Sequence, residues 1–312
     1  MDKKEQPLVS VIVNCYNGEK YLQEAIDSVY AQTYKNWEIV FWDNASTDRS
    51  AEIAKSYESK IKYFKCDTNI SLGKARNKAI EKCNGDLIAF LDTDDIWAPE
   101  KLVKQISEFC NKDIVLNFTN TKYINDDGVK YNLYKKSKVF NINLFPRLLE
   151  SNIICLSSVM ILSEAVKQLS ELFDDTLMVS EEYDLFLRLA YGKRCSYING
   201  NPLTIYRMHN ESLTYNNKLL FPEENKLILN KLIKMYPEIS IKYKKAIRKN
   251  IANIEFLYAM GEFRLNNRIS SRRRLFPHLK TNKKFIIPYF FTFTDFKYFE
   301  FFLKLVNKQH LI

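Results

Sequence analysis

A short apolar run leads directly into an acidic group in the stretch Gly85-Asp-Leu-Ile-Ala-Phe-Leu-Asp-Thr-Asp-Asp95. The run Leu87–Leu91 is uncharged and bounded by polar residues, which is typical of a buried strand. The group Asp92–Asp95 should therefore lie at the carboxyl end of that strand. In open α/β sheets, ligands bind at this end of the strands.

Three similar runs precede this strand, and each is apolar or β-branched and ends in polar residues. They cover residues 8–13, 37–42 and 61–64. Apolar residues at helical spacing follow these strands, over residues 21–31, 72–83 and 99–110, and Ser46 or Thr47 can cap a further helix. This alternation of strand and helix predicts an open α/β sheet of parallel strands flanked by helices.

The polar loops after three of these strands are expected to meet. The strand at residues 8–13 can neighbour both the strand at 37–42 and the strand at 87–91. The loops that follow the three strands are Asn14–Gly18, Asp43–Asp48 and Asp92–Asp95. Because parallel strands end at the same edge of a sheet, these loops could line one crevice.

Several nucleotide-binding classes are excluded because their glycines are missing. The chain has 7 Gly among 312 residues, where average usage would give about 22. The loop Asn14–Gly18 lacks the Gly-x-Gly-x-x-Gly of dinucleotide-binding folds, and no Walker lysine motif occurs. The glycine-rich, basic first loop of a sugar-phosphate nucleotidyltransferase is also missing. Carboxylates at strand ends instead suit Mg²⁺ or Mn²⁺ carrying a diphosphate.

Charge divides the chain into two parts. The formal net charge is +10. Residues 216–312 carry 20 Lys or Arg against 7 Asp or Glu, whereas residues 1–215 carry 27 against 30. Apolar residues recur at helical spacing in the basic part, at 227–235 and 251–260. We therefore predict a first domain over residues 1–215 and a helical, basic, aromatic-rich region over residues 216–312.

The cysteines and the apolar runs indicate the compartment. Six cysteines are scattered without a Cys-x-x-Cys pair or zinc-ligand spacing, which is typical of reduced thiols in the cytoplasm. The first apolar run ends at Val13 and is too short for a signal peptide. The longest uncharged stretch in the tail, Phe285–Thr294, has ten residues, whereas a spanning helix needs about 20. We expect a soluble or peripheral protein.

Six segments, read in order from residue 9 to residue 209, resemble the successive motifs of family 2 glycosyltransferases, which have the GT-A fold. The segments are Val9–Asn17, Trp42–Asp48, Asn69–Asn77, Gly85–Asp95, Glu181–Leu189 and Tyr206–His209. The resemblance implies inverting transfer of a sugar from a nucleoside diphosphate, usually UDP, to an acceptor hydroxyl. It implies Mn²⁺ or Mg²⁺ as cofactor, and a saccharide or lipid-linked acceptor in cell-surface polysaccharide synthesis.

The resemblance also implies a role for each matching residue. Glu182 would be the general base, although the family most often has Asp there, and Asp94 would hold the metal. The other matches would bind the nucleotide sugar: Tyr16 and Asp43 at the base, Asp92 at the ribose, Arg76 facing phosphate, and His209 near the diphosphate and metal. Asn44 departs from the family, which commonly has a second Asp at that position.

Structural alternatives stay open for several of these residues. Residues 181–189 predict an amphipathic helix, and acids at its start are favoured by the helix dipole whatever their function. Glu181 therefore remains an alternative to Glu182 as the base. Tyr16 could be a packing residue, His209 could be structural, and Asp95 could serve only the start of the next helix.

The basic tail has two interpretations. It can be a helical subdomain with a solvated basic face, or a surface that rests on anionic lipid with aromatic residues at the interface. We favour the lipid surface, at the inner face of the membrane, and no nucleic-acid partner, because no RNA-binding motif accompanies the charge. Two rival classes stay open for the whole chain: a non-catalytic sugar-nucleotide-binding module and a nucleic-acid-binding protein.

Overall fold

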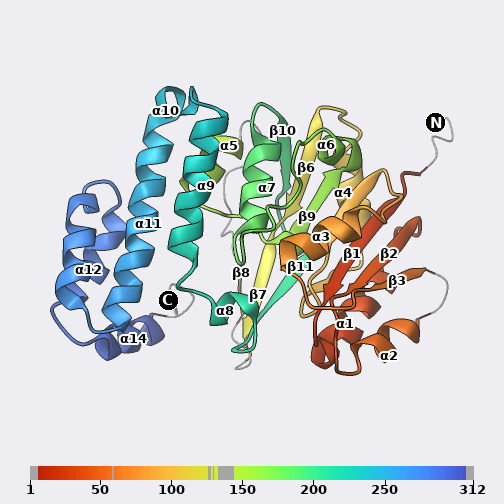
Figure 1. The fold of residues 1–312 in the computed structure, drawn as a ribbon, viewed down its shortest axis with the longest axis horizontal. Coiled ribbons are helices and arrows are strands. Elements are labelled where there is room, and N and C mark those ends of the chain that lie inside the picture. Colours follow the sequence, from red (N-terminus) through yellow and green to blue (C-terminus); the bar gives the residue numbers. More distant parts are fainter. Residues whose placement is uncertain (1–5, 58–59, 126–127, 129, 133–143, 307–312) are drawn as a thin grey trace. The chain divides into compact units, whose positions relative to one another are not determined.

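A seven-stranded sheet forms the centre of the N-terminal part of the chain (Figure 1). The computed structural model describes residues 6–57, 60–125, 128, 130–132 and 144–306. The strand order in this sheet is β10-β6-β9-β4-β1-β2-β3. The strands are β1 (Val9–Cys15), β2 (Trp37–Asp43), β3 (Ile61–Lys65), β4 (Leu87–Phe90), β6 (Ile114–Thr119), β9 (Val159–Leu162) and β10 (Arg194–Ile198).

Strand β1 lies between β2 and β4 and pairs in parallel with both. The expected neighbours of the first strand are thereby confirmed, as is the open, mostly parallel α/β sheet. One strand departs from the expectation, because β9 runs antiparallel to both β4 and β6. Gly85 lies two residues before β4, and a Cβ there would lie 2.6 Å from the backbone nitrogen of Ser10, so only glycine fits.

Helices cover the sheet (Figure 1). Helix α1 buries the apolar stripe that its spacing predicts. In α1 the buried apolar residues are Leu22, Ala25, Ile26 and Val29, which pack into one cluster with residues of β1 and β2. The helices of this part are α1 (Glu19–Tyr30), α2 (Ser50–Lys55), α3 (Leu72–Ile80), α4 (Lys101–Glu108), α6 (Ser163–Lys167), α7 (Glu181–Ala190) and α8 (Leu213–Asn216), with the short 3₁₀ helix η1 (Leu156–Ser158).

A second, four-stranded sheet was not expected from the sequence. Its order is β5-β11-β7-β8, with β5 (Ile96–Trp97), β11 (Thr204–Met208), β7 (Thr121–Asn125) and β8 (Lys130–Asn132). Strand β11 pairs antiparallel with β5, so that Thr204 lies opposite Trp97. This pairing brings the residues after β11 beside the acidic loop Asp92–Asp95.

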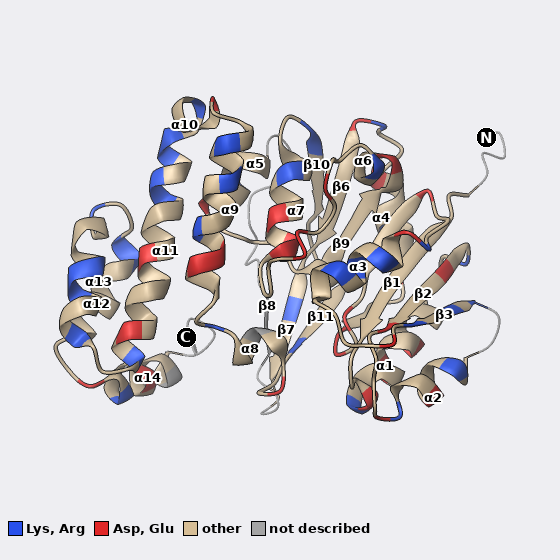
Figure 2. Ribbon diagram, in the orientation of Figure 1, with Lys and Arg blue, Asp and Glu red and all other residues tan. Residues whose placement is uncertain are grey.

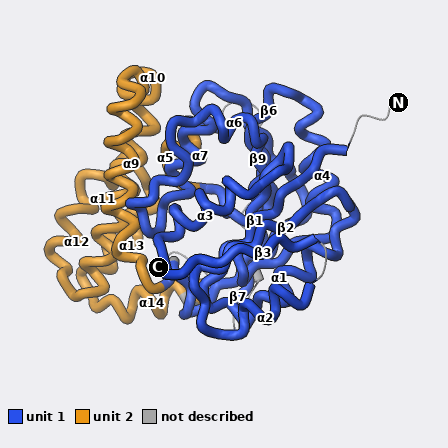
Figure 3. The backbone as a smooth tube through the Cα atoms, turned by 45° about the vertical axis from the view of Figure 1, so that its right-hand side comes forward, with its two compact units in different colours: residues 1–145, 153–215 blue, residues 146–152, 216–312 orange. Residues whose placement is uncertain are grey.

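Two compact units make up the chain (Figure 3): residues 1–145 with 153–215, and residues 146–152 with 216–312. The second unit is helical, and the segments expected to be helical at 227–235 and 251–260 lie in α9 and α11. Its elements are the end of α5 (Leu144–Glu150), α9 (Phe221–Met235), α10 (Ile239–Lys242), α11 (Lys244–Arg264), α12 (Arg268–Leu275), η2 (Phe276–His278), η3 (Lys283–Phe285), α13 (Ile286–Phe291) and α14 (Phe296–Leu305).

Part of the expected aromatic surface is the core of this second unit. Phe263, Phe285, Phe299 and Leu303 are buried together in one hydrophobic cluster. Segment 146–152 joins the unit through Asn250, whose Nδ2 donates to the carbonyl of Leu149 at 2.8 Å. Among the described helices, none is both long enough and apolar enough to cross a membrane.

Candidate active site

The three polar loops at the strand ends contact one another. The backbone nitrogen of Asn17 donates to Ser46 Oγ at 3.1 Å, and the backbone nitrogen of Thr47 donates to Asn17 Oδ1 at 2.8 Å. On the other side, a Cβ at Gly18 would lie 3.1 Å from Thr93 Oγ1. The first loop is therefore held between the second loop and the acidic loop.

Asp43 is fully buried at the end of β2. Its Oδ1 accepts from the backbone nitrogen of Ser46 at 2.7 Å, and its Oδ2 accepts from the hydroxyl of Tyr63 at 2.5 Å. Burial raises the pKa of Tyr63, and the Asp43 carboxylate raises it further. The phenol therefore stays a donor that fixes the orientation of Asp43.

Tyr16 lies in the first loop with 53% of its surface exposed. That exposure does not fit the packing alternative and leaves the ring open to a ligand. The next residue, Asn17, has φ 53°, and Ala45 in the second loop has φ 66°. Both loops thus contain a non-glycine residue in the left-handed region, which is costly and often occurs at functional sites.

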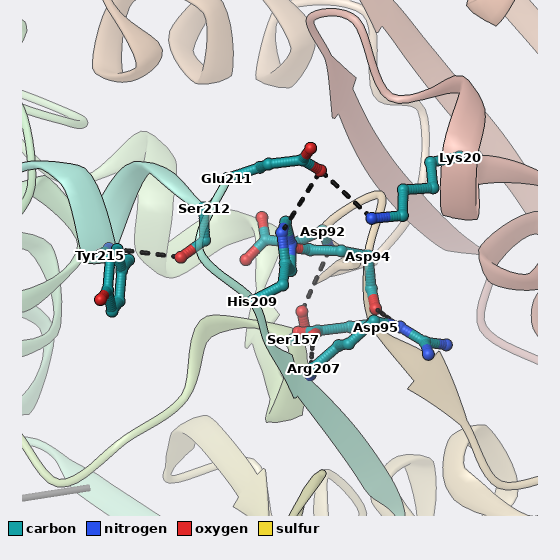
Figure 4. A network of polar contacts seen from close by, with 10 residues as sticks. All are labelled: Lys20, Asp92, Asp94, Asp95, Ser157, Arg207, His209, Glu211, Ser212 and Tyr215. Carbon is teal, nitrogen blue, oxygen red and sulfur yellow. Dashed lines mark hydrogen bonds and ion pairs between the residues drawn. The ribbon is translucent and has the colours of Figure 1, made fainter. Parts of the chain in front are cut away.

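The acidic loop lies against the end of β11 (Figure 4). His209 Nε2 is 2.9 Å from Asp94 Oδ2. Arg207 fixes the same loop, because its backbone nitrogen donates to Asp95 Oδ1 at 3.1 Å and its Nε donates to the carbonyl of Asp94 at 3.2 Å. The structure thus brings together Asp94 and His209, which lie far apart in the sequence.

Asp92 is held by two contacts from different elements. Its backbone nitrogen donates to Ser157 Oγ at 3.1 Å, and its Oδ1 accepts from Arg76 at 3.2 Å. Burial raises the pKa of Asp92, and Arg76 opposes this rise while Asp94 adds to it. Burial raises the pKa of Asp95 well above its ordinary value, with further contributions from Asp94 and Asp92.

These residues fit a hard divalent cation. Asp94 offers carboxylate oxygen and His209 offers imidazole nitrogen, a donor set that Mn²⁺ accepts. The Asp94 carboxylate also disfavours the charge of Asp92, and Asp94 and Asp92 both disfavour the charge of Asp95. A bound divalent cation would reverse that effect, because it stabilises the ionised carboxylates around it.

A second acidic group, which the sequence did not indicate, lies elsewhere in the same unit. Ligand atoms of Glu171, Asp174 and Asp184 lie within 4.8 Å of one another. Arg188 donates to Asp184 Oδ2 from Nε at 2.9 Å and to the carbonyls of Glu171 and Leu172. The positive charge of Arg188 already pairs with the carboxylate of Asp184. We therefore interpret this acidic group as a structural anchor of α7 rather than a metal site.

Arg76 is a buried cation among three carboxylates. Its side chain is 5% exposed and lies 3.2 Å from Asp92 Oδ1 and 3.9 Å from Glu182 Oε2. It also forms an ion pair with Glu181. In this structure the guanidinium faces these carboxylates, and its expected place beside phosphate stays a prediction. The guanidinium links the acidic loop to the start of α7.

Helix α7 distinguishes the two glutamates at its start. Nine of its ten residues are buried, and Glu182 is the exception. The Glu182 side chain is 21% exposed, whereas that of Glu181 is 1% exposed and is paired with Arg76. The helix has the expected amphipathic sequence, and its polar face is largely buried as well. Of these two glutamates, Glu182 has the more accessible carboxylate.

The environment of Glu182 adjusts its proton affinity. Burial raises the pKa of Glu182 to about 8, the Glu181 carboxylate adds to the rise, and Arg76 opposes it. A carboxylate with a pKa near the working pH is suited to general-base catalysis. Asp184, the third acid of α7, is held by Arg188 in a buried ion pair at 2.8 Å.

Comparison with known proteins identifies the family. The sequence profile of glycosyl transferase family 2 matches residues 10–169, so the chain belongs to this family. The match ends before Glu182 and His209.

Two relatives of this chain illustrate the similarity. The chain is 34% identical over 190 residues to the uncharacterized glycosyltransferase MJ1057 of Methanocaldococcus jannaschii. That match covers 59% of this chain and 65% of the relative. The chain is 31% identical over 212 residues to WfgD of Escherichia coli, with 67% and 80% of the two chains covered. WfgD is named a UDP-Glc:alpha-D-GlcNAc-diphosphoundecaprenol beta-1,3-glucosyltransferase.

Solved structures share the GT-A fold with this chain. Residues 1–349 of Staphylococcus aureus TarS in complex with UDP-GlcNAc align with a TM-score of 0.62 at 19% identity, over 86% of this chain and 88% of that chain. The mannosyltransferase PcManGT of Pyrobaculum calidifontis in complex with GDP-Man and Mn²⁺ aligns with a TM-score of 0.53 at 14% identity, over 89% and 77%. At these identities the likeness concerns the fold.

Several residues of the site were not predicted from the sequence. Arg207 lies inside the quoted motif Tyr206–His209, so its charge beside the histidine was an available signal. Tyr63 and Ser157 have no such signal in the sequence, because neither belongs to a recognisable motif. The partner of Arg76 was also missed, since Glu181 lies 105 positions away.

Proposed function

We propose that this protein transfers a sugar from a nucleoside diphosphate sugar to an acceptor hydroxyl, with inversion at the anomeric carbon. One observation carries the proposal. A partly exposed carboxylate with a raised pKa, Glu182, lies in the same buried ion-pair cluster as Asp92 of the acidic loop. The two groups that such a transfer requires, a base and a diphosphate-binding loop, are thus joined by Arg76.

The proposed donor is a UDP-sugar. TarS was solved with UDP-GlcNAc, and the name of WfgD gives UDP-Glc as its donor. In this chain Tyr16 and Asp43 would contact the nucleotide base, and Asp92 would contact the ribose. Asp43 is fully buried and already accepts two hydrogen bonds, so the contact with the base would require the loop Asp43–Asp48 to open. Each carboxylate oxygen can then accept a second hydrogen bond.

Asp94 and His209 would hold Mn²⁺ or Mg²⁺. When bound, the cation neutralises the charge that develops on the departing diphosphate. The fit of these donors supports the assignment, as does the Mn²⁺ in the structure of PcManGT. Arg207 positions the acidic loop, because it holds the Asp94 carbonyl and the Asp95 carboxylate.

Glu182 would act as the general base. The acceptor oxygen attacks the anomeric carbon, its proton passes to a Glu182 carboxylate oxygen, and the bond from that carbon to the diphosphate oxygen breaks. Attack from the side opposite the leaving group inverts the configuration. Arg76 and Glu181 would act as positioning residues, because their ion pair fixes the start of α7 relative to Asp92.

The proposed acceptor is a saccharide, free or lipid-linked, in cell-surface polysaccharide synthesis. The name of WfgD, an acceptor linked to diphosphoundecaprenol, supports a lipid-linked acceptor. Such an acceptor would place the protein in the cytoplasm, peripherally on the inner face of the membrane.

Donor hydrolysis over a panel of UDP-, GDP- and TDP-sugars, with Mn²⁺ present, tests the proposal. We expect turnover with at least one UDP-sugar by the full chain, and turnover at least about 10²-fold lower by the Glu182→Gln variant. Equal hydrolysis by both proteins would contradict the assigned base. Absence of both binding and hydrolysis for every sugar nucleotide would contradict the proposed function.

A further inference from the structure

The segment Lys280–Phe293 of the second unit exposes cations and large apolar side chains side by side. Lys280, Lys283 and Lys284 are exposed. They are followed by four apolar side chains, each between 39% and 64% exposed: Ile286, Ile287, Phe290 and Phe293. Phe285 and Pro288 are buried between them and hold the segment on the helices below.

A basic groove adjoins this segment at Lys280. It has a volume of about 530 Å³, and its lining residues are Lys244, Lys245, Arg248, Lys249, Lys280 and Thr281. Figure 2 shows the corresponding blue positions on the first turns of α11 and on the segment that leads into α13. Lys249 is paired with Glu150 at 2.6 Å, and the other four cations are exposed. A groove lined by five cations is suited to a phosphate group.

The exposed apolar side chains favour a phospholipid membrane as the partner that supplies the phosphate group. Exposed apolar groups in a cluster are rare on soluble surfaces and indicate a partner that covers them. Ile286 and Ile287 are aliphatic and cannot stack on nucleic acid bases, whereas they can enter the acyl boundary of a bilayer. Arg272 lies 4.4 Å from the centre of the Phe293 ring, so cation and ring meet at one place.

We infer that residues 280–293 and the adjoining basic groove dock this protein on an anionic phospholipid surface. The lysines bind headgroup phosphates, and Ile286, Ile287, Phe290 and Phe293 enter the interface. The relevance of this surface to a lipid-linked acceptor rests on the proposed function, but the binding itself does not require transfer. Donor hydrolysis and vesicle binding therefore fail or succeed separately.

Vesicle co-sedimentation of the full chain tests the inference, with phosphatidylcholine vesicles and with vesicles that also contain phosphatidylglycerol. We expect binding to the anionic vesicles only, weakening as salt rises. The triple variant Lys280→Gln, Lys283→Gln, Lys284→Gln should bind at least about tenfold more weakly. The matched control Lys112→Gln, Lys167→Gln, Lys193→Gln removes three exposed lysines of the first unit, and it should bind like the parent.

A second pair of variants tests the apolar contribution. Ile287→Ser with Phe290→Ser should also weaken binding, whereas Val103→Ser with Leu227→Ser, at exposed apolar positions elsewhere, should not. Equal binding to both kinds of vesicle would overturn the inference, as would equal losses in a variant and its control. Binding of single-stranded RNA or inorganic phosphate without vesicle binding would also overturn it. Unchanged thermal melting of all variants shows that they fold, whether or not the protein hydrolyses a donor.

Discussion

At the scale of single residues, the account depends on how Glu181 and Arg76 set the proton affinity of Glu182. A carboxylate accepts a proton only when ionised, and burial raises the pKa of Glu182 to about 8. We therefore expect the rate of transfer to rise as the pH passes through about 8. Removing the Glu181 charge in Glu181→Gln removes one cause of the rise, so the midpoint should move to lower pH. Steady-state pH profiles of the two proteins would measure this shift of the midpoint. Coinciding profiles would show that the Glu181 charge does not affect the pKa of Glu182.

The same raised pKa has a consequence for stability. A carboxyl group whose pKa is raised in the folded protein favours folding in its neutral form, and this contribution is lost as pH rises. The loss occurs between the ordinary value of 4.5 and about 8. The neutral variant Glu182→Gln should therefore melt higher than the parent protein at pH 9 and close to it at pH 4. Thermal melts across this range test the prediction. A variant that melts lower at pH 9 would show that Glu182 is ionised and stabilising.

The metal assignment is tested at Asp94. Asp94→Asn keeps the volume of the side chain but removes the charge that a hard cation requires. We expect chelator to abolish transfer by the parent protein and Mn²⁺ to restore it, and we expect Mn²⁺ to restore little in the variant. Asp174→Asn, in the acidic group near Arg188, is the matched control and should keep its response to Mn²⁺. Full activity in chelator would contradict a metal at this site.

At the scale of elements, the second loop stores strain at Ala45, whose φ of 66° is costly for a residue with a Cβ. Ala45→Gly should relieve this strain by about 1–2 kcal/mol, partly offset by about 0.4–1 kcal/mol of chain entropy in the unfolded state. We expect a small net stabilisation, measured by denaturant unfolding. A clear destabilisation would show that the methyl group of Ala45 packs in a way that outweighs its backbone conformation.

The sequence predicts the elements whose signals are local. Strand β4 and the acidic loop follow from one apolar run and its carboxylates, and the buried face of α1 follows from its spacing. The prediction that Ser46 or Thr47 caps α2 was wrong, because α2 begins at Ser50. The Ser50 nitrogen donates to Asp48 Oδ1 at 3.0 Å, and Ser46 Oγ accepts from the nitrogen of Asn17. The second sheet was also missed, since β11 and β7 are polar strands some 80 positions apart whose pairing has no local signal.

Site residues show the same limit. The motifs identify Asp94, His209 and Glu182, but not the contacts among them. That Arg76 points to Glu181 depends on where α3 and α7 lie in the folded chain. The choice between Glu181 and Glu182 likewise depends on burial. The pattern of α7 predicts an amphipathic helix, but not which of the two glutamates is covered.

At the scale of the whole molecule, the boundary between the units is discontinuous. Charge and composition place it near Tyr215, whereas segment 146–152 also belongs to the second unit. A chain ending at residue 215 would lose Asn250, the partner of the Leu149 carbonyl, and Lys249, the partner of Glu150. Leu148 and Leu149 are buried, and exposing such side chains costs about 1.5–3 kcal/mol each.

We therefore expect the shortened chain, residues 1–215, to melt at a lower temperature than the full chain and to aggregate. Differential scanning calorimetry of both chains measures the difference. Replacing Leu148 and Leu149 by Gln in the shortened chain should reduce the aggregation. An unchanged melting temperature on shortening would show that segment 146–152 does not depend on residues 216–312.

In the proposed reaction, Glu182 takes the proton from the acceptor. The most direct test compares Glu182→Gln with its neighbour Glu181→Gln, measuring the rate of transfer and, by calorimetry, the affinity for the UDP-sugar. The account predicts that Glu182→Gln keeps donor affinity while its kcat falls about 10²-fold or more. Glu181→Gln should lose less kcat than Glu182→Gln, because Glu181 only positions the start of α7, and its pH profile should shift. Loss of transfer in Glu181→Gln with little loss in Glu182→Gln would contradict the account.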